Sequence, residues 1–431
     1  MSHHVILGAG PAGVIAAETI RKLSPADSIT IIGDEPETPY SRMAIPYLLM
    51  GNINEAGTYL RKSSTHFDDL KIKVCVAHVQ SVQAATKTVV LDGGETVPFD
   101  TLLVATGSRP VTPPIPGIKS EGVHRCWTLE DTRAIAALAK PGARVLQLGA
   151  GFIGCIIMEA LAARGVKLSV VEMGDRMVPR MMGPTAGGMI RDWCETKGVE
   201  VFTSTKVDSI DAGAPLSVKL SNGKTMLADL VISAAGVRPA IGFLENSGIT
   251  CLLGVLTDEH LQTNVPGIFA AGDCAEAFDK VSGKMIVSAI QPNAAEQARI
   301  AAANMVAHAR GRAAHAELKG VTQINVLDTL GLISTSFGDW QGVPGGEHVE
   351  LTDKPSGRHL SLQFKDDVLV GCNSVGWTEH VGVMRGLVEG QVHLGAWKDT
   401  LKNDPTLLME AYLASAQAQG QWSGAGQERI R

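Results

Sequence analysis

Two segments of the chain repeat one pattern, in which a short apolar run is followed by a glycine-rich turn and then by helical periodicity. The first copy covers Val5–Ile20 and the second covers Val145–Leu161. Each copy leads to another apolar run that ends near an acidic residue, in Ile29–Glu35 and in Leu168–Met173. Strand patterns that alternate with helical ones predict parallel sheets covered by helices. We therefore expect an α/β fold built on a duplicated strand–turn–helix unit.

Two junctions divide this α/β region. Thr112–Gly117 reads TPPIPG, a composition typical of a linker, and a second junction is expected near Ile232–Ala240. A chain of 431 residues has room for two or three domains. We expect a discontinuous first domain, a second domain inserted into it and a C-terminal third domain, at 1–112 with 245–317, at 113–244 and at 318–431.

The pattern changes in the last part of the chain. A long Ala-rich helix is predicted over residues 292–309, and beyond Gly320 short alternating strands follow, such as 359–364 and 367–375. A final helix is predicted over 404–419, which opens with an Asp cap and a Pro at the first helical position. The region after Gly320 is therefore expected to be an α+β domain.

Composition and charge exclude several classes of protein. Hydrophobic residues make up 45% of the chain and charged residues 19%, proportions typical of a globular protein. The net charge is −6 and no run of Lys and Arg stands out, which argues against nucleic-acid binding. We see neither a secretory signal nor an apolar segment as long as a membrane span. We expect a soluble, cytoplasmic protein.

Seven cysteines are spread through the chain, and they form no CxxC, CxxxxC or CxxCxxC motif. Their odd number and wide spacing indicate a reducing compartment. Neither structural disulfides nor an iron–sulfur cluster held by a compact motif is expected, and no metal site is predicted. Most of the thiols are expected to be small buried side chains.

The first glycine turn has the chemistry of a dinucleotide site. Gly8, Gly10 and Gly13 form GxGxxG between a strand and a helix. The first glycine makes the tight turn, the second lets the backbone approach a diphosphate, and the third lets helix and strand pack closely. The phosphates would lie at the helix N-terminus, where free N–H groups and the helix dipole favour negative charge.

Gly149, Gly151 and Gly154 repeat the turn in the second copy. Glu172 ends the next strand, where a carboxylate can accept hydrogen bonds from both ribose hydroxyls of a nucleotide. The same carboxylate would repel a 2′-phosphate. The sequence therefore predicts two dinucleotides, and the second site is expected to prefer NADH over NADPH.

The chain resembles the pyridine nucleotide–disulfide oxidoreductase superfamily in four ordered motifs: GAGPAG at 8–13, ATGSRP at 105–110, GAGFIG at 149–154 and IFAAGDCA at 268–275. The resemblance is strong from residue 1 to about residue 310. It implies two Rossmann-like domains, as in glutathione reductase: FAD binds to the discontinuous first domain and NAD to the second, while the third domain forms an interface. The implied cofactor-binding residues are Gly8, Gly10, Pro11, Ala12, Gly13, Asp34, Glu35, Arg42, Val79, Ala105, Thr106, Gly107, Gly149, Gly151, Phe152, Ile153, Gly154, Glu172, Gly236, Gly272, Asp273, Ala294 and Ala295.

The resemblance implies individual roles for some of these residues. Asp273 is expected to hydrogen-bond the flavin ribityl chain, and the backbone of Val79 is expected to meet adenine. Glu35 resembles the acid that binds the FAD ribose, with Asp34 as the alternative.

Pro39–Gly51 resembles the flavin-facing segment of rubredoxin, ferredoxin and nitrite reductases, which would place Arg42 near the flavin ring or the FAD phosphates. Disulfide reductases carry CxxxxC here and related oxidases a single Cys. This chain has Ser41–Met43 instead, so no thiol relay or sulfenate is expected. The predicted Ala-rich helix should point its N-terminus at the flavin, with Ala294 and Ala295 nearest.

The whole chain, including Val375–Gly390, is also similar to the flavoprotein (epsilon) subunits of 2-oxoacid oxidoreductase complexes such as NAD-dependent phenylglyoxylate dehydrogenase. This implies an FAD-dependent enzyme that moves hydride between NAD(H) and flavin. Electrons would be exchanged with an iron–sulfur protein or subunit in a hetero-oligomer. No catalytic side chain is required. Trp340, Trp377 and Trp397 are candidate interface residues, with core packing as their alternative role.

Three other functions remain open. The first is a stand-alone NADH-dependent rubredoxin or ferredoxin reductase, or an NADH oxidase. The second is a non-catalytic scaffold, against which the two intact glycine motifs and Asp273 argue. The third is a quinone reductase at a membrane surface, but the final predicted helix has no Lys or Arg to bind anionic lipid.

The first glycine motif and Asp273 together predict one tightly bound FAD per chain. Denaturing the purified protein should release a flavin that chromatography identifies as FAD, because the glycine turn is suited to a diphosphate. Release of FMN, or of no flavin, would refute the assignment.

Overall fold

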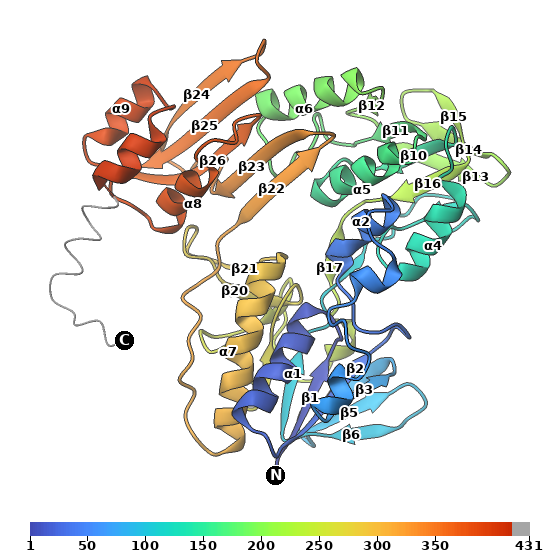
Figure 1. Cartoon of the computed structure of the whole chain (residues 1–431), viewed down its shortest axis with the longest axis vertical. Helices are drawn as coiled ribbons and strands as arrows, with labels where there is room; N and C mark the ends of the chain where they lie inside the picture. The colour runs from blue at the N-terminus through green and yellow to red at the C-terminus, as the bar shows by residue number, and fades with distance from the viewer. Residues whose placement is uncertain (416–431) are drawn as a thin grey trace. The chain divides into compact units, whose positions relative to one another are not determined.

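Residues 1–415 are described by the computed structural model, and their contacts group them into two units (Figure 1). The first unit comprises Met1–Val111 and Val237–Val321, and the second comprises Thr112–Gly236 with the described residues from Thr322 onward. The C-terminal region thus groups with the middle of the chain. The three-domain division expected from the sequence stays a prediction.

A five-stranded parallel sheet forms the centre of the first unit. Its strands are continuous apolar runs because a parallel sheet is covered on both faces. Val5, Ile6 and Leu7 are all fully buried. In spatial order the strands are β19 (Ile268–Ala270), β7 (Thr101–Val104), β1 (His3–Leu7), β2 (Ser28–Gly33) and β3 (Ile72–Val76).

Two helices cover one face of this sheet, and a small antiparallel sheet covers the other. Helix α1 (Pro11–Leu23) packs along α7 (Gln291–Ala309), and both helices bury alanines, whose small side chains allow close approach (Figure 1). Ile6 packs in the core beneath the helices, whereas Leu7 packs in the core on the opposite face. The covering strands are β4 (Val79–Gln83), β5 (Thr88–Leu91) and β6 (Thr96–Pro98).

The second unit repeats this arrangement. Its parallel sheet has the order β12 (Glu200–Phe202), β11 (Lys167–Val171), β10 (Arg144–Leu148), β16 (Leu230–Ser233) and β9 (Val123–His124). Helix α5 (Phe152–Ala163) follows β10 as α1 follows β1. The antiparallel strands β13 (Val207–Asp211), β14 (Leu216–Leu220) and β15 (Thr225–Ala228) share a hydrophobic core with the parallel sheet. The duplicated unit predicted from the sequence is therefore present.

The C-terminal region of the second unit is a five-stranded antiparallel sheet. Its strands, in order, are β22 (Ile324–Thr329), β23 (Leu332–Gly338), β26 (Val368–Val375), β25 (Arg358–Lys365) and β24 (Glu347–Asp353). Helix α8 (Val381–Glu389) packs against β26 and β23, and α9 (Trp397–Asn403) packs against β24.

This sheet is joined to the nucleotide-fold part of the same unit. Strand β22 packs against α5, and the Trp193 indole N–H on α6 (Pro184–Thr196) donates to the carbonyl of Leu330 at 3.2 Å. The sheet therefore contacts α5, which follows the second glycine turn, and also α6.

The predicted elements are confirmed where the structure describes them. The Ala-rich helix spans Gln291–Ala309, and the two predicted C-terminal strands are β25 and β26. The final predicted helix is helical over 408–415, and the rest of it lies outside the described residues. Within residues 1–415, no helix is both long enough and apolar enough to cross a membrane.

Candidate functional site

The turn between β1 and α1 brings three backbone segments into contact. Gly8 has φ +111°, and a Cβ at this position would lie 2.1 Å from the carbonyl oxygen of Ala105. A Cβ at Gly13 would lie 1.9 Å from the oxygen of Gly8, whereas one at Gly10 would meet nothing within 4 Å. The first and third glycines thus allow close packing, and the second leaves open space where a ligand could approach.

The N-terminus of α1 is left open for an anion. Gly10 is the N-cap and makes no side-chain cap, and the first turn has no acidic residue. The unpaired N–H groups and the positive end of the helix dipole therefore point out of the glycine turn, and together they fit a diphosphate. Pro11 stands at the start of the helix, where its missing N–H costs nothing.

The second glycine turn has the same geometry. Gly149 has φ +95°, and its Cβ would lie 2.4 Å from the oxygen of Ala234, while a Cβ at Gly154 would lie 2.5 Å from the oxygen of Gly149. Gly151 again has open space and leaves α5 without a side-chain cap. Two further predicted contacts, Phe152 and Ile153, begin α5, and Gly236 with φ +99° follows the segment packed against Gly149.

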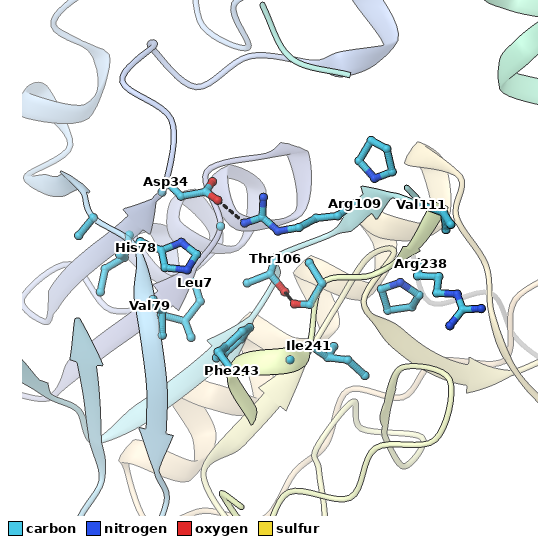
Figure 2. A pocket seen from close by; sticks show the side chains of 18 residues that line it. Leu7, Asp34, His78, Val79, Thr106, Arg109, Val111, Arg238, Ile241 and Phe243 are labelled. Atoms are coloured by element: carbon cyan, nitrogen blue, oxygen red, sulfur yellow. Dashed lines mark hydrogen bonds and ion pairs between the residues drawn. The ribbon is translucent and has the colours of Figure 1, made fainter. Parts of the chain in front are cut away.

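A cavity of about 630 Å³ opens beside the first glycine turn, within the first unit (Figure 2). Four predicted residues line it: Gly8, Asp34, Val79 and Thr106. Its size is in the range of small-molecule sites, and its strand-end position fits the adenosine part of a dinucleotide. The sequence reasoning had not identified other lining residues, among them His78, Arg109, Arg238, Ile241 and Phe243. Of these, Arg109 and Arg238 had a signal, because Arg109 lies inside the ATGSRP motif and Arg238 inside the predicted junction at Ile232–Ala240.

Asp34 is the carboxylate in this cavity, and Arg109 forms an ion pair with it (Figure 2). Burial by itself would raise the pKa of Asp34, but the hydrogen bond and the charge of Arg109 outweigh burial and hold that pKa below its usual value. Asp34 therefore stays ionised and able to accept hydrogen bonds from ribose hydroxyls.

Glu35 is engaged elsewhere and does not line the cavity. One of its oxygens is 2.5 Å from Nη2 of Arg42, and the other accepts the hydroxyl of Tyr40. Of the two acids that the sequence left open for the FAD ribose, the geometry favours Asp34. The Glu35 ion pair also gives Arg42 a protein partner, whereas the sequence placed Arg42 at the flavin or the FAD phosphates.

The Gly272–Asp273 turn lies where α1 and α7 begin. A Cβ at Gly272, which has φ +80°, would be 3.3 Å from the Cβ of Ala12 and 3.5 Å from that of Ala294. Burial raises the pKa of Asp273, against the opposing effects of a hydrogen bond from Ser108 and the charge of Arg42. The structure thus brings Ala12, Gly272 and Ala294 together, with the half-buried Ala295 following on α7.

The ATG segment, Ala105–Gly107, directly follows β7 in the first unit. Ala105 is buried and donates its N–H to the carbonyl of Leu7. The hydroxyl of Thr106 donates to the carbonyl of Ala240 at 2.8 Å, and Gly107 has φ +66°. This segment is therefore hydrogen-bonded both to the end of β1 and to the residue that follows β17 (Val237–Pro239).

The segment expected to face the flavin contains no sulfur other than that of methionine. Ser41 donates its hydroxyl to Oε1 of Gln291 at the start of α7, and Met43 is 55% exposed. Cys274, in the IFAAGDCA motif, is fully buried, and burial raises its pKa to about 11. A thiol with this pKa is protonated at neutral pH and is a poor nucleophile.

Glu172 organises the second turn through the backbone. One of its oxygens accepts the N–H of Ala150 and the other accepts the N–H of Gly174, both at 2.7 Å. The carboxylate is thereby held at the end of β11, beside the second glycine turn. Each oxygen keeps a lone pair for a ribose hydroxyl.

Among residues 1–415, no group of three or more His, Cys, Asp and Glu side chains is arranged to hold a metal ion. The two glycine turns present backbone N–H groups and helix N-termini, with carboxylates beside them. This donor set fits dinucleotides, whose charge is concentrated in the diphosphate.

The chain is similar in sequence to known proteins. A family model described as pyridine nucleotide-disulphide oxidoreductase matches residues 2–303. The chain is 31% identical to an NADH oxidase from Methanocaldococcus jannaschii, over 86% of this chain and 87% of that protein. It is 30% identical to the NADH-dependent phenylglyoxylate dehydrogenase subunit epsilon from Aromatoleum evansii, over 89% of this chain and 91% of that protein.

A solved structure has the same fold. The structure of a covalent putidaredoxin reductase–putidaredoxin complex matches 96% of this chain and 99% of that chain, with a TM-score of 0.86. The sequence identity is 21%, so this likeness concerns the fold alone. It confirms the predicted pair of Rossmann-like domains followed by an antiparallel C-terminal region.

Replacing Glu172 by Gln should reduce the preference for NADH over NADPH. The neutral amide no longer repels a 2′-phosphate and binds the ribose hydroxyls less well. We expect the ratio of kcat/KM for NADH to that for NADPH to fall about tenfold, which corresponds to about 1.4 kcal/mol. Glu200→Gln, at the amino end of β12, is the matched control and should leave the ratio unchanged. An unmodified protein that uses NADPH as well as NADH would contradict the prediction.

Alkylation of accessible cysteines should leave NADH-to-ferricyanide activity largely intact, because the thiols of the binding motifs are buried and protonated. Only Cys75 and Cys251 are partly exposed among the seven. A Cys75→Ser, Cys251→Ser variant treated in parallel shows whether any loss arises from these two sites. The prediction fails if a charge-transfer absorption band between a thiolate and the flavin is seen.

Proposed function

The chain belongs to the pyridine nucleotide-disulphide oxidoreductase family, and on that premise we propose that it carries electrons between NAD(H) and an iron–sulfur partner. It is an FAD-dependent NAD(H) oxidoreductase, with the two cofactors typical of the family. The observation that carries the proposal is the duplicated glycine turn, because one chain with two dinucleotide sites can bring a flavin and a nicotinamide together.

The first unit would hold FAD through four kinds of contact. The N-terminus of α1 would bind the diphosphate beside Gly10, and Asp34 would accept the ribose hydroxyls. The backbone of Val79 would meet adenine, and Asp273 would hydrogen-bond the ribityl chain. Residues 1–112 and 245–317 are accordingly assigned to FAD, 113–244 to NAD and 318–431 to an interface domain.

FAD, when bound, supplies both the hydride chemistry toward nicotinamide and the single-electron chemistry toward an iron–sulfur cluster. The protein's own residues bind and orient the cofactors, and no side-chain nucleophile or general base is assigned. The N-terminus of α7, which begins with Gln291 and carries Ala294 and Ala295, would place its positive dipole end near the flavin and so stabilise negative charge there.

The finer proposal is that the chain is the NAD-linked flavoprotein subunit of a hetero-oligomeric 2-oxoacid dehydrogenase in the cytoplasm. The relative from Aromatoleum evansii is such a subunit, and the match covers 89% of this chain, so it extends well into the C-terminal region. Trp340, Trp377 and Trp397 of that region are half-buried, and each keeps surface that a partner could cover.

A second candidate is a stand-alone NADH oxidase, favoured by the similarity to the Methanocaldococcus jannaschii protein over 86% of the chain. A reductase of free ferredoxin or rubredoxin belongs to the same alternative, since carriers of that kind are typical partners in this family. Both would work without a permanent partner subunit. Purification therefore separates the two candidates.

Purification from the native host at moderate salt should recover the chain together with a subunit that carries an iron–sulfur cluster. NADH oxidation should then be accelerated by that subunit. A chain that runs alone, and whose NADH oxidation no iron–sulfur protein accelerates, contradicts the subunit proposal and favours the oxidase.

Replacing Trp377 by Ala should separate the partner surface from the cofactor sites. The indole stacks under the guanidinium of Arg358 at 5.2 Å, and Arg358 also pairs with Glu379. We expect the rate with the iron–sulfur subunit to fall about tenfold, as for loss of an aromatic anchor, while the rate with ferricyanide stays the same. Trp193→Ala is the control for a loss caused by internal packing. The Trp193 indole donates to the carbonyl of Leu330, in the turn between β22 and β23 of the same unit.

A further inference from the structure

Gln297 is a buried polar residue in the second turn of α7, and it lies directly behind the Gly272–Asp273 turn. The residue is 1% exposed. Its Oε1 accepts the backbone N–H of Gly272 at 2.7 Å, while its Nε2 is buried and has no hydrogen-bond partner among the described residues. Leaving a buried donor unpaired costs free energy, so an amide at this position is unfavourable unless its one contact matters.

The contact that Gln297 makes fixes a backbone turn at a crowded place. Gly272 has a left-handed φ of +80° and lies in van der Waals range of Ala12 on α1 and Ala294 on α7. The peptide plane of Gly272 can rotate only if its N–H loses the acceptor. That plane joins Ala271 to Gly272, so its orientation fixes the start of the turn that carries Asp273.

Asn304, on the same helix, is a buried amide for comparison, because its hydrogen bonds join chain segments away from the Gly272–Asp273 turn. It is also 1% exposed. Its Oδ1 accepts the N–H groups of His315 and Ala316, and its Nδ2 donates to the carbonyls of His260 and Ala316. All its polar atoms are paired and tie chain segments together. Gln297 makes one contact, and that contact is to the turn that carries Asp273.

We propose that Gln297 is a positioning residue, which orients Asp273 toward FAD by holding the N–H of Gly272. Because its Nε2 is buried, Gln297 acts from behind the turn and does not touch the cofactor. The inference rests on the FAD contact proposed above for Asp273. It adds to that contact the residue that directs it.

A double-mutant cycle on the FAD-loaded protein tests the proposal. FAD release is followed by the recovery of flavin fluorescence in Gln297→Met, in Asp273→Asn and in the combined variant. Met has nearly the shape of Gln and removes the acceptor, so release should become about tenfold faster, as expected when a buried N–H loses its partner. In the Asp273→Asn background the same change should add less than about twofold, because coupled residues are not additive.

The outcomes separate the positioning role from the contact on which it rests. If Asp273→Asn alone leaves FAD release unchanged, the proposed contact of Asp273 is wrong. If both single variants speed release and their effects multiply, the contact stands and the positioning role of Gln297 is refuted.

Asn304→Met is the matched control, since it removes a buried amide from the same helix. It should lower the melting temperature without speeding FAD release. Equal acceleration by Asn304→Met would mean that general loosening of α7 explains the result, and the proposal would fall. If Gln297→Met does not fold, Gln297→Asn takes its place in the cycle, because the shorter amide withdraws the acceptor from Gly272.

Discussion

The contact between backbone segments at the glycine turns is the constraint on which both nucleotide folds depend. At Gly8 and Gly13 a side chain would place its Cβ about 2 Å from a carbonyl oxygen, well inside van der Waals contact. Any such atom would push α1 away from β1 or separate β1 from the end of β7. The N-terminus of α1 would then no longer lie at the carboxyl edge of the sheet, where an anion can reach it. Gly149 and Gly154 impose the same constraint on α5.

Once the helices are held in place, one carboxylate follows the neighbouring strand beside each glycine turn, Asp34 after β2 and Glu172 after β11. Both carboxylates are held in place by neighbours, but the neighbours differ. Arg109 pairs with Asp34 and offsets the effect of its burial, whereas Glu172 is held by two backbone N–H groups. A backbone-held acid has a fixed direction, which suits discrimination between two nicotinamide nucleotides. An acid paired with an exposed guanidinium can exchange its partner when a cofactor binds.

Small side chains also allow close packing in the helical layer of the first unit. Alanines along α1 and α7 let the two helices pack closely, and their first turns meet at Gly272. Within this packing, the backbone N–H of Gly272 donates to the buried side chain of Gln297. The turn that carries Asp273 is thus bonded to a buried amide on α7, the longest helix among the described residues.

The sequence by itself determined the duplicated α/β fold, the two glycine turns and the Ala-rich helix, because apolar periodicity and glycine spacing are local properties of the chain. It also brought out Glu35 as the acid for the FAD ribose, with Asp34 as the alternative. Adjacent residues in extended chain point to opposite sides, and no local pattern says which side holds the cavity. Only the tertiary structure distinguishes the two acids, because Arg42 and Tyr40 contact Glu35 whereas Asp34 lies in the cavity with Arg109, 75 residues away. His78, Arg238 and Phe243 entered the site in the same way, because long-range chain packing brings them to one strand edge.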